Sequence, residues 1–119
     1  MTTAAFLKSP EYGLIGFEIS GHSGYGEAGS DIVCAAVSAL SQAVANGLKS
    51  VVRAPVMFDQ NDGNASLTVC LTPECTKEQL EKSQILLDTL YEALQAIARD
   101  YPRNVRIIFK ERRKYTCSA

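Results

Sequence analysis

Three features that mark particular protein classes are missing from this chain of 119 residues, and the first is an excess of basic charge. Its 12 lysines and arginines stand against 13 acidic residues, so the formal net charge is −1. A domain that binds nucleic acid is usually basic, and we therefore expect no direct nucleic-acid binding. The one basic cluster, residues 110–114, is a solvated tail in the simplest interpretation. In the other interpretation it contacts an RNA-rich or acidic partner.

The second missing feature is a targeting or membrane segment. Residues 1–10 lack the cationic start and the long apolar core of a signal peptide. No apolar run approaches the ~20 residues needed to cross a membrane. We therefore expect a cytoplasmic protein without a membrane partner. In the cytoplasm its four cysteines would be reduced thiols, namely Cys34, Cys70, Cys75 and Cys117.

The third missing feature is a set of metal ligands. The chain has no Cys-x-x-Cys pair, since Cys70 and Cys75 lie five positions apart, and its only histidine is His22. Zinc sites usually combine four cysteine or histidine ligands at characteristic spacings. We therefore expect no metal site and no other cofactor.

The residues that are present predict one domain over residues 1–119. The hydrophobic fraction is 46% and the charged fraction 21%, both ordinary for a globular protein. The order β-β-α-β-β-α-β indicates the α+β class, with a mixed sheet packed with two helices. Hydrophobic periodicity predicts strands at residues 2–8, 14–20, 51–58, 65–71 and 104–110, the third confined to an edge or a bulge by Pro55.

The two predicted helices differ in character. The second begins at Thr76, which has capping-box spacing to Gln79, and it carries a leucine-rich stripe as far as residue 101. The first begins at Ser30 or Asp31 as N-cap and ends at Asn46, before a glycine. It is apolar on nearly every side, so we expect the sheet to cover it on one side and a second helix or a second subunit on another.

Candidate chemistry gathers in the glycine-rich segment that leads into the first helix. Its residues are Gly21-His22-Ser23-Gly24-Tyr25-Gly26-Glu27-Ala28-Gly29-Ser30-Asp31-Ile32-Val33-Cys34. Free N–H groups and the positive end of the dipole in a helix's first turn favour a cysteine thiolate. A histidine in reach can take the thiol proton and later donate a proton to a leaving amine. The same N–H groups could stabilise an oxyanion, and Asp31 could orient His22 or only cap the helix.

Other interpretations of the same residues stay open at this point. A cysteine in a helix rich in alanine and valine is more often a buried small hydrophobe than a nucleophile. A glycine-rich loop before a helix could instead hold a phosphate. Residues 24–29 match Gly-x-Gly-x-x-Gly, but no βαβ unit with a suitably placed acidic residue follows, and the ending of a P-loop is absent.

Residues 21–40 closely resemble the signature of the ribosomal-processing cysteine protease family, Prp. The family pattern is Gly-His-(Ala/Ser)-Gly, a short loop, and then Asp-Ile-Val-Cys-Ala-Ala-Val-Ser. The resemblance implies that His22 is the catalytic base and Cys34 the nucleophile. It also places Asp31 and Ser38 beside the dyad, where we expect Ser38 to give structural support. The substrate loop that the resemblance implies contains Gly21, Ser23, Gly24, Tyr25, Gly26 and Gly29.

The resemblance further implies a small bacterial endopeptidase that is typically a homodimer. Such an enzyme removes the short N-terminal extension of a large-subunit ribosomal protein and cuts after a motif with adjacent aromatics. The glycines give the loop freedom to admit a peptide, and Tyr25 could line an aromatic subsite or contact a lid. Glu27 and Ala28 depart from the family pattern and leave only loop details open. The main alternative is a non-enzymatic ribosome-associated binding module with Cys34 as a core residue, and a weaker one is a thiol enzyme acting on a small molecule.

Overall fold

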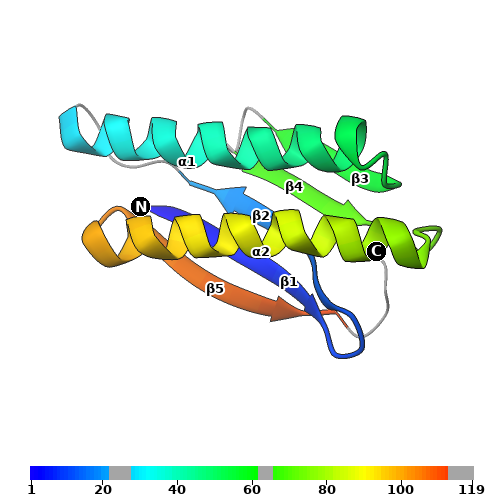
Figure 1. Cartoon of the computed structure of the whole chain (residues 1–119). Coiled ribbons are helices and arrows are strands. Elements are labelled where there is room, and N and C mark those ends of the chain that lie inside the picture. The colour runs from blue at the N-terminus through cyan, green and yellow to red at the C-terminus, as the bar shows by residue number, and fades with distance from the viewer. Residues whose placement is uncertain (22–27, 62–65, 113–119) are drawn as a thin grey trace.

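The computed structural model describes residues 1–21, 28–61 and 66–112 and confirms the predicted α+β class (Figure 1). The expected loop residues Ser23, Gly24, Tyr25 and Gly26 lie outside these ranges, as do His22 and Cys117. The elements follow the predicted order, with one extra helical turn. They are β1 (Thr2–Ser9), β2 (Gly13–Ser20), α1 (Ala28–Asn46), η1 (Gly47–Val51), β3 (Val56–Asn61), β4 (Ser66–Leu71), α2 (Lys77–Asp100) and β5 (Val105–Glu111).

The five strands form one mixed sheet in the order β3-β4-β2-β1-β5. Strands β1 and β2, β2 and β4, and β3 and β4 pair antiparallel, whereas β1 and β5 pair parallel. Strand β3 is an edge strand that begins directly after Pro55, as predicted from the missing N–H of proline. Figure 1 shows both helices side by side across the same face of the sheet.

The hydrophobic core lies between this sheet face and the two helices. The strand register places Phe6, Phe17 and Val69 next to one another on β1, β2 and β4, and all three are fully buried. The ring of Phe6 meets the ring of Tyr91 from α2 edge-on, with the centroids 5.3 Å apart. Burying a side chain of this size stabilises the fold by about 1.5–3 kcal/mol. The row of core residues therefore fixes the sheet against α2.

The start of α2 follows its sequence closely. The Gln79 backbone N–H donates to the Thr76 hydroxyl over 3.1 Å, and the Thr76 N–H donates to Gln79 Oε1 over 2.9 Å. This reciprocal pair is a capping box. The Gln79 side-chain amide also donates to the Arg53 carbonyl oxygen over 3.0 Å. The cap thereby ties the start of α2 to the segment that follows α1.

The predicted start of the first helix is wrong, whereas its predicted end at Asn46 is confirmed. Helix α1 already begins at Ala28, so Ser30 and Asp31 lie inside it rather than at its N-cap. At the other end Asn46 keeps right-handed helical angles, and the chain continues through the π-helical turn η1. This continuation buries Leu48 completely. The left-handed conformation after this helical stretch falls on Arg53, with a φ of 60°, and not on Gly47.

Gly47 serves close packing and is not a left-handed stop. A Cβ at this position would lie 3.1 Å from Leu86 Cδ1 on α2, tighter than most side-chain contacts. A glycine after a helical pattern is typical of a left-handed stop. The helix does end at Asn46, but Gly47 has no positive φ and the chain continues as η1. Residues 51–55, predicted as the start of the third strand, belong to the turn and its exit instead.

Two further expectations need correction. Cys70 is disulfide-bonded, whereas Cys34 and Cys75 are free thiols. The expectation of four reduced cysteines rested on the compartment alone, which does not determine pairing within one chain. In addition, the helical segment Ile32–Val51 is long and apolar enough to cross a membrane by length and composition. Helices in the interior of soluble proteins meet the same criterion, so this segment is only weak evidence for a membrane span.

Candidate active site

The free thiol of Cys34 lies on α1, half-buried, six residues after the helix begins. The dipole effect of a helix falls off within its first turn. The expected placement of Cys34 in that first turn is therefore wrong, because the helix starts earlier than its sequence signals suggest. Position on the helix does not supply the activation that we expected for this thiol.

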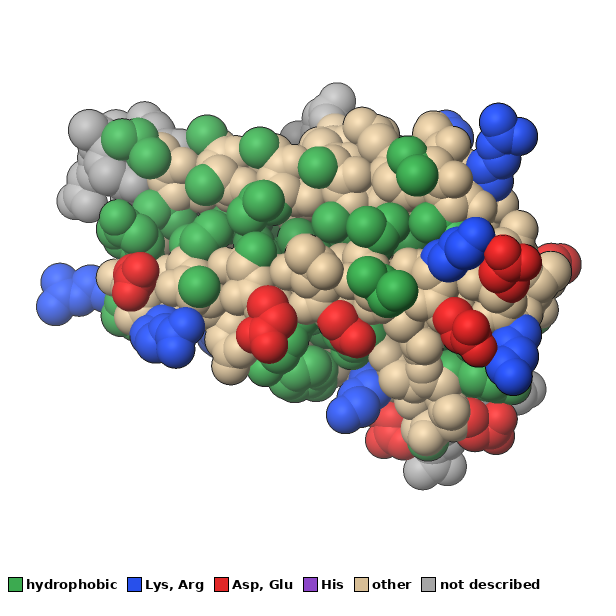
Figure 2. Space-filling view, in the orientation of Figure 1, with side chains coloured by type: hydrophobic (Ala, Val, Ile, Leu, Met, Phe, Trp, Pro, Cys, Tyr) green, Lys and Arg blue, Asp and Glu red, His purple; other side chains and the backbone are tan. Residues whose placement is uncertain are grey.

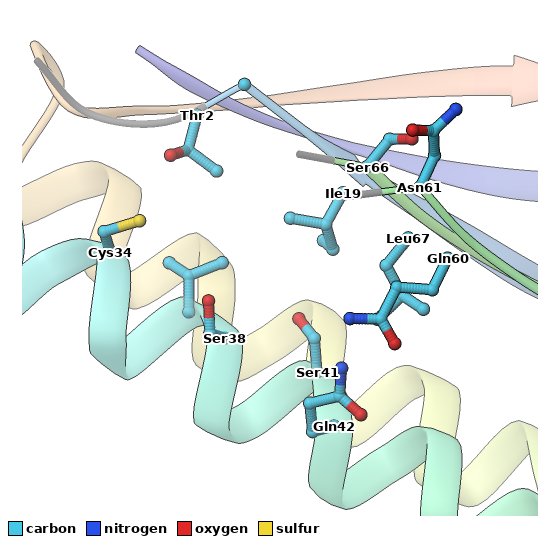
Figure 3. A pocket seen from close by; sticks show the side chains of 12 residues that line it. Thr2, Ile19, Cys34, Ser38, Ser41, Gln42, Gln60, Asn61, Ser66 and Leu67 are labelled. Atoms are coloured by element: carbon cyan, nitrogen blue, oxygen red, sulfur yellow. The ribbon is translucent and has the colours of Figure 1, made fainter. Parts of the chain in front are cut away.

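A pocket opens on the side of α1 that carries Cys34. From the helix it is lined by Cys34, Val37, Ser38, Ser41 and Gln42, which fall on one face because their spacing follows the helical repeat. The cavity has a volume of about 180 Å³. Figure 3 shows the Cys34 thiol and the hydroxyls of Ser38 and Ser41 directed from α1 toward the sheet.

The other wall of the pocket comes from one end of the sheet. Strands β1 and β4 begin at this end and β2 and β3 finish there, since neighbouring strands among them run antiparallel. The pairing of Ile19 with Leu67 and of Asn61 with Ser66 brings these side chains together. The sheet residues that line the pocket are Thr2, Ile19, Gly21, Gln60, Asn61, Ser66 and Leu67.

Gly21 marks the point where the chain leaves β2 at the edge of the pocket. Its φ of 77° is a conformation that residues with a side chain rarely adopt. A Cβ here would also lie 2.5 Å from the Met1 carbonyl oxygen, which is too close for any real contact. The first glycine of the family signature therefore has a structural reason. The next residue, His22, lies outside the described residues, so its approach to Cys34 stays a prediction.

The described lining of the pocket combines uncharged polar groups with apolar side chains. It contains no Asp, Glu, Lys or Arg. Asp31 lies in α1, but its side chain is not among those that the structure describes. Within the described parts of the chain no cluster of His, Cys, Asp and Glu could hold a metal ion. The chemistry available at the described wall is therefore a thiol among hydroxyls and amides.

Several lining residues were missed as site candidates. Ser41 and Gln42 are seven and eight positions after Cys34, so helical spacing could have placed them on its face. Thr2, Gln60 and Ser66 reach the pocket only through the pairing of distant strands. No local signal in the sequence identifies those three.

Comparison with known proteins decides the family. The sequence profile of the family described as cysteine protease Prp matches residues 1–106. The chain belongs to the Prp family. Its membership confirms the resemblance seen in residues 21–40, and the chain is accordingly a cysteine peptidase.

Individual proteins resemble the chain over nearly its whole length. The ribosomal processing cysteine protease Prp of Bacillus subtilis is 27% identical over 107 residues, which cover 90% of this chain and 96% of the relative. The crystal structure of SMU.848 from Streptococcus mutans superposes with a TM-score of 0.79 at 28% identity, covering 94% of this chain and 96% of that one.

A second similar structure contains a peptide. It is the Prp of S. aureus in complex with a covalently linked product peptide, with a TM-score of 0.77 and 25% identity. The superposition covers 92% of this chain and all of that chain. Ribosomal processing and cysteine protease activity are thus the roles named for the relatives.

Proposed function

We propose that this Prp family member is an endopeptidase that removes the short N-terminal extension of a bacterial large-subunit ribosomal protein. The observation that carries the proposal is the free Cys34 thiol in a pocket at whose edge Gly21 leads directly to His22. Family membership supplies the reaction class. The names of the relatives, ribosomal processing proteases, support the class of substrate.

In the proposed mechanism His22 and Cys34 act as a dyad. His22 takes the proton of the Cys34 thiol, and the thiolate attacks the carbonyl carbon of the scissile bond. The protonated His22 then donates its proton to the leaving amine, which releases the mature protein. Water, with His22 again as base, hydrolyses the thioester that joins the extension to Cys34. No cofactor takes part in these steps.

The neighbours of the dyad have supporting roles in the proposal. Ser38 lies one helical turn after Cys34 and lines the same pocket, so its hydroxyl can support a group bound beside the thiol. Asp31 orients His22 or supports the helix start. The structure places Gly29, which we expected in the loop, inside α1. The substrate loop of the proposal is therefore formed by Gly21, Ser23, Gly24, Tyr25 and Gly26, and it opens for the peptide and carries His22 to Cys34.

We also propose that the enzyme is a cytoplasmic homodimer. Figure 2 shows a band of hydrophobic side chains between α1 and α2. Ile32 on α1 is 70% exposed and Ile85 on α2 is 68% exposed. Only 28% of the apolar window in Ile32–Val51 is buried within the chain. A contiguous apolar surface marks an interaction site, and a second copy of the chain would cover this one.

Light scattering tests the dimer. We expect twice the mass of the chain at micromolar concentration and a monomer for the Ile32→Glu/Ile85→Glu variant. A monomer for the wild-type chain would refute the proposed dimer without touching the proposed chemistry.

The non-enzymatic binding module was the main alternative, with Cys34 as a core residue. Membership of a protease family contradicts it. Cys34 is also only half-buried and faces a pocket rather than the core.

Mass spectrometry tests the proposed reaction. The large-subunit ribosomal protein with its N-terminal extension is incubated with the enzyme, and the masses of the products are measured. We expect a single cut that releases the extension after paired aromatic residues. An intact substrate, or cuts scattered through the mature protein, would refute the proposed substrate.

A further inference from the structure

The pocket beside Cys34 contains two buried hydroxyl groups that have no hydrogen-bond partner. Thr2 is 2% exposed and Ser41 is 1% exposed, and both line the cavity. Within the part of the chain that the structure describes, neither Thr2 Oγ1 nor Ser41 Oγ has a hydrogen-bond partner. Most buried polar atoms in proteins are satisfied, because an unpaired one destabilises the fold. Two unpaired hydroxyls in one cavity indicate a partner that comes from outside the chain.

The two hydroxyls lie on different walls of the pocket, Thr2 on the sheet side and Ser41 on the α1 side. Figure 3 shows the Thr2 side chain pointing from β1 toward α1, and the Ser41 hydroxyl pointing from α1 toward the sheet. Cys34 shares the same face of α1, seven positions before Ser41. A ligand group bound by Thr2 and Ser41 would therefore lie in the same pocket as the Cys34 thiol.

Both hydroxyls are held by regular structure. The Thr2 N–H donates to the Asn104 carbonyl oxygen over 2.8 Å, and Thr2 pairs with Val105 of β5. Ser41 lies in the middle of α1. Regular structure therefore fixes the backbone that carries each hydroxyl and keeps both side chains on the walls of the pocket.

The described lining favours an uncharged partner. Among the described residues no charged side chain lines the pocket, so this wall offers no counter-charge to an ion. Each hydroxyl can both donate and accept, as can the nearby amides of Gln42 and Gln60. An amide offers an N–H and a carbonyl together, which matches this set. Ile19, Val37 and Leu67 add apolar surface for the carbon atoms of the same ligand.

The volume of the cavity fits a short piece of peptide. At about 180 Å³ it is several times larger than one water molecule, which occupies ~30 Å³ in the liquid. It is smaller than the roughly 300–1,000 Å³ typical of sites for drug-sized ligands. One side chain, or one or two peptide units, fills such a space.

We propose that Thr2 and Ser41 form a substrate subsite that hydrogen-bonds an uncharged amide group of the peptide close to the scissile bond. The inference rests on the proposed peptidase function and adds the two residues that hold the substrate beside Cys34. The amide belongs either to the peptide main chain or to an asparagine or glutamine side chain. These are two sources of one chemistry, and the experiment below separates them.

The test removes each hydroxyl while keeping the shape of the side chain. Thr2→Val and Ser41→Ala are assayed with a fluorogenic peptide that spans the extension and the cut site. We expect KM to rise about threefold to tenfold for each variant, the range of one lost hydrogen bond. The melting temperature should stay level or rise, because an unpaired buried hydroxyl has been removed. Thr2→Ser keeps the hydroxyl and should keep a KM close to that of the wild type.

Ser83→Ala is the matched control. Ser83 is fully buried on α2, its hydroxyl is also unpaired, and it does not line the pocket. This variant should change the melting temperature in the same direction as Ser41→Ala and leave KM unchanged. A rise in KM for Ser83→Ala equal to that for Ser41→Ala would mean that stability, and not a subsite, explains the effect.

Changes in the peptide identify the source of the amide. One series replaces each glutamine by methionine and each asparagine by leucine, and a second series replaces single main-chain amides by esters. A peptide that lacks the amide bound by Thr2 and Ser41 should have a higher KM with wild-type enzyme. With the Thr2→Val/Ser41→Ala enzyme the same peptide change should raise KM little further, because the hydrogen bonds are already lost and the two effects are coupled. Coupling in one series supports the subsite and names its source.

Two results would overturn the inference, and they differ in meaning. If wild-type enzyme cuts the peptide and KM is unchanged in both Thr2→Val and Ser41→Ala, the hydroxyls face only water and the subsite does not exist. If wild-type enzyme leaves the peptide uncut, the proposed function fails and the subsite falls with it.

Discussion

Helices α1 and α2 lie side by side on one sheet face but differ in their caps, their charges and their exposed surfaces. Helix α2 has a capping box, buried leucines on one side and ion pairs on the other, such as Lys82 with Glu78 at 2.9 Å. Helix α1 carries no charged residue in its described side chains, exposes Ile32 and Leu40, and runs on into a π-helical turn. The contrast indicates that α2 mainly stabilises the fold. Helix α1 provides the Cys34 thiol, one wall of the pocket and an exposed apolar surface.

Removing the thiol from α1 tests the different roles of the two helices with the largest expected effect. Cys34→Ala should lower kcat/KM for the extension peptide by at least about 10³-fold, as loss of a nucleophile does in comparable enzymes. The far-ultraviolet circular dichroism spectrum and the melting temperature should stay close to those of the wild type. Cys75→Ala is the matched control, since Cys75 is the other half-buried free thiol, and it should remain active. An active Cys34→Ala enzyme would contradict the assignment of Cys34.

A core substitution on α2 should give the opposite result. Leu94 is fully buried against the sheet, and Leu94→Ala removes its packing and leaves a cavity. We expect the free energy of unfolding to fall by about 2–5 kcal/mol, measured by urea denaturation. The kcat of the folded fraction should be unchanged at low temperature. A loss of kcat without a loss of stability would mean that α2 also contributes to the active site.

Loss of the α2 cap should have a smaller effect of the same kind. Thr76→Ala removes the hydroxyl that accepts from the Gln79 N–H. Substitution of a threonine N-cap by alanine destabilises a protein by about 1 kcal/mol, which urea denaturation can resolve. Thr76→Ser keeps the acceptor and should recover most of the loss. Equal stability of Thr76→Ala and the wild type would show that the capping box contributes nothing.

The smallest expected effect concerns the exposed charges of α2. The hydrogen bond and the charge of Lys82 lower the pKa of Glu78 below its ordinary value. Lys82→Ala should therefore move the Glu78 pKa up toward that value, as followed by NMR titration of the side-chain carboxyl. Because the folded-state pKa is lowered, the pair stabilises the helix above the ordinary glutamate pKa and loses its effect as the pH falls through the lowered one. Activity should be unaffected, and an unchanged Glu78 pKa would refute the pairing in solution.

The sequence predicted α2 better than α1. The second helix was predicted correctly because its signals are local, with Thr76 and Gln79 three positions apart and a leucine stripe after them. The start of α1 and the conformation that follows its end at Asn46 were missed because their signals were ambiguous. Ser30 and Asp31 are good caps that fall inside the helix, and Gly47 serves contact with Leu86 rather than a left-handed stop.

The active-site region was only partly predictable for a similar reason. The family signature in residues 21–40 is contiguous, so it identified the family without knowledge of the fold. Thr2, Gln60 and Ser66 reach the pocket through the pairing of strands that are distant in sequence. Sheet register of this kind depends on the whole fold and leaves no local pattern. The roles of His22 and Asp31 stay predictions.

Selective alkylation tests most directly the central claim, that Cys34 is the nucleophile. Cys34 and Cys75 are both free and half-buried, so accessibility alone predicts similar rates for the two thiols. The enzyme is treated with limiting iodoacetamide at neutral pH, and peptide mapping by mass spectrometry follows each cysteine over time. An activated nucleophile predicts that Cys34 is modified well ahead of Cys75 and that activity is lost in step with it. Equal rates for the two cysteines, or full activity after complete modification of Cys34, would contradict the account.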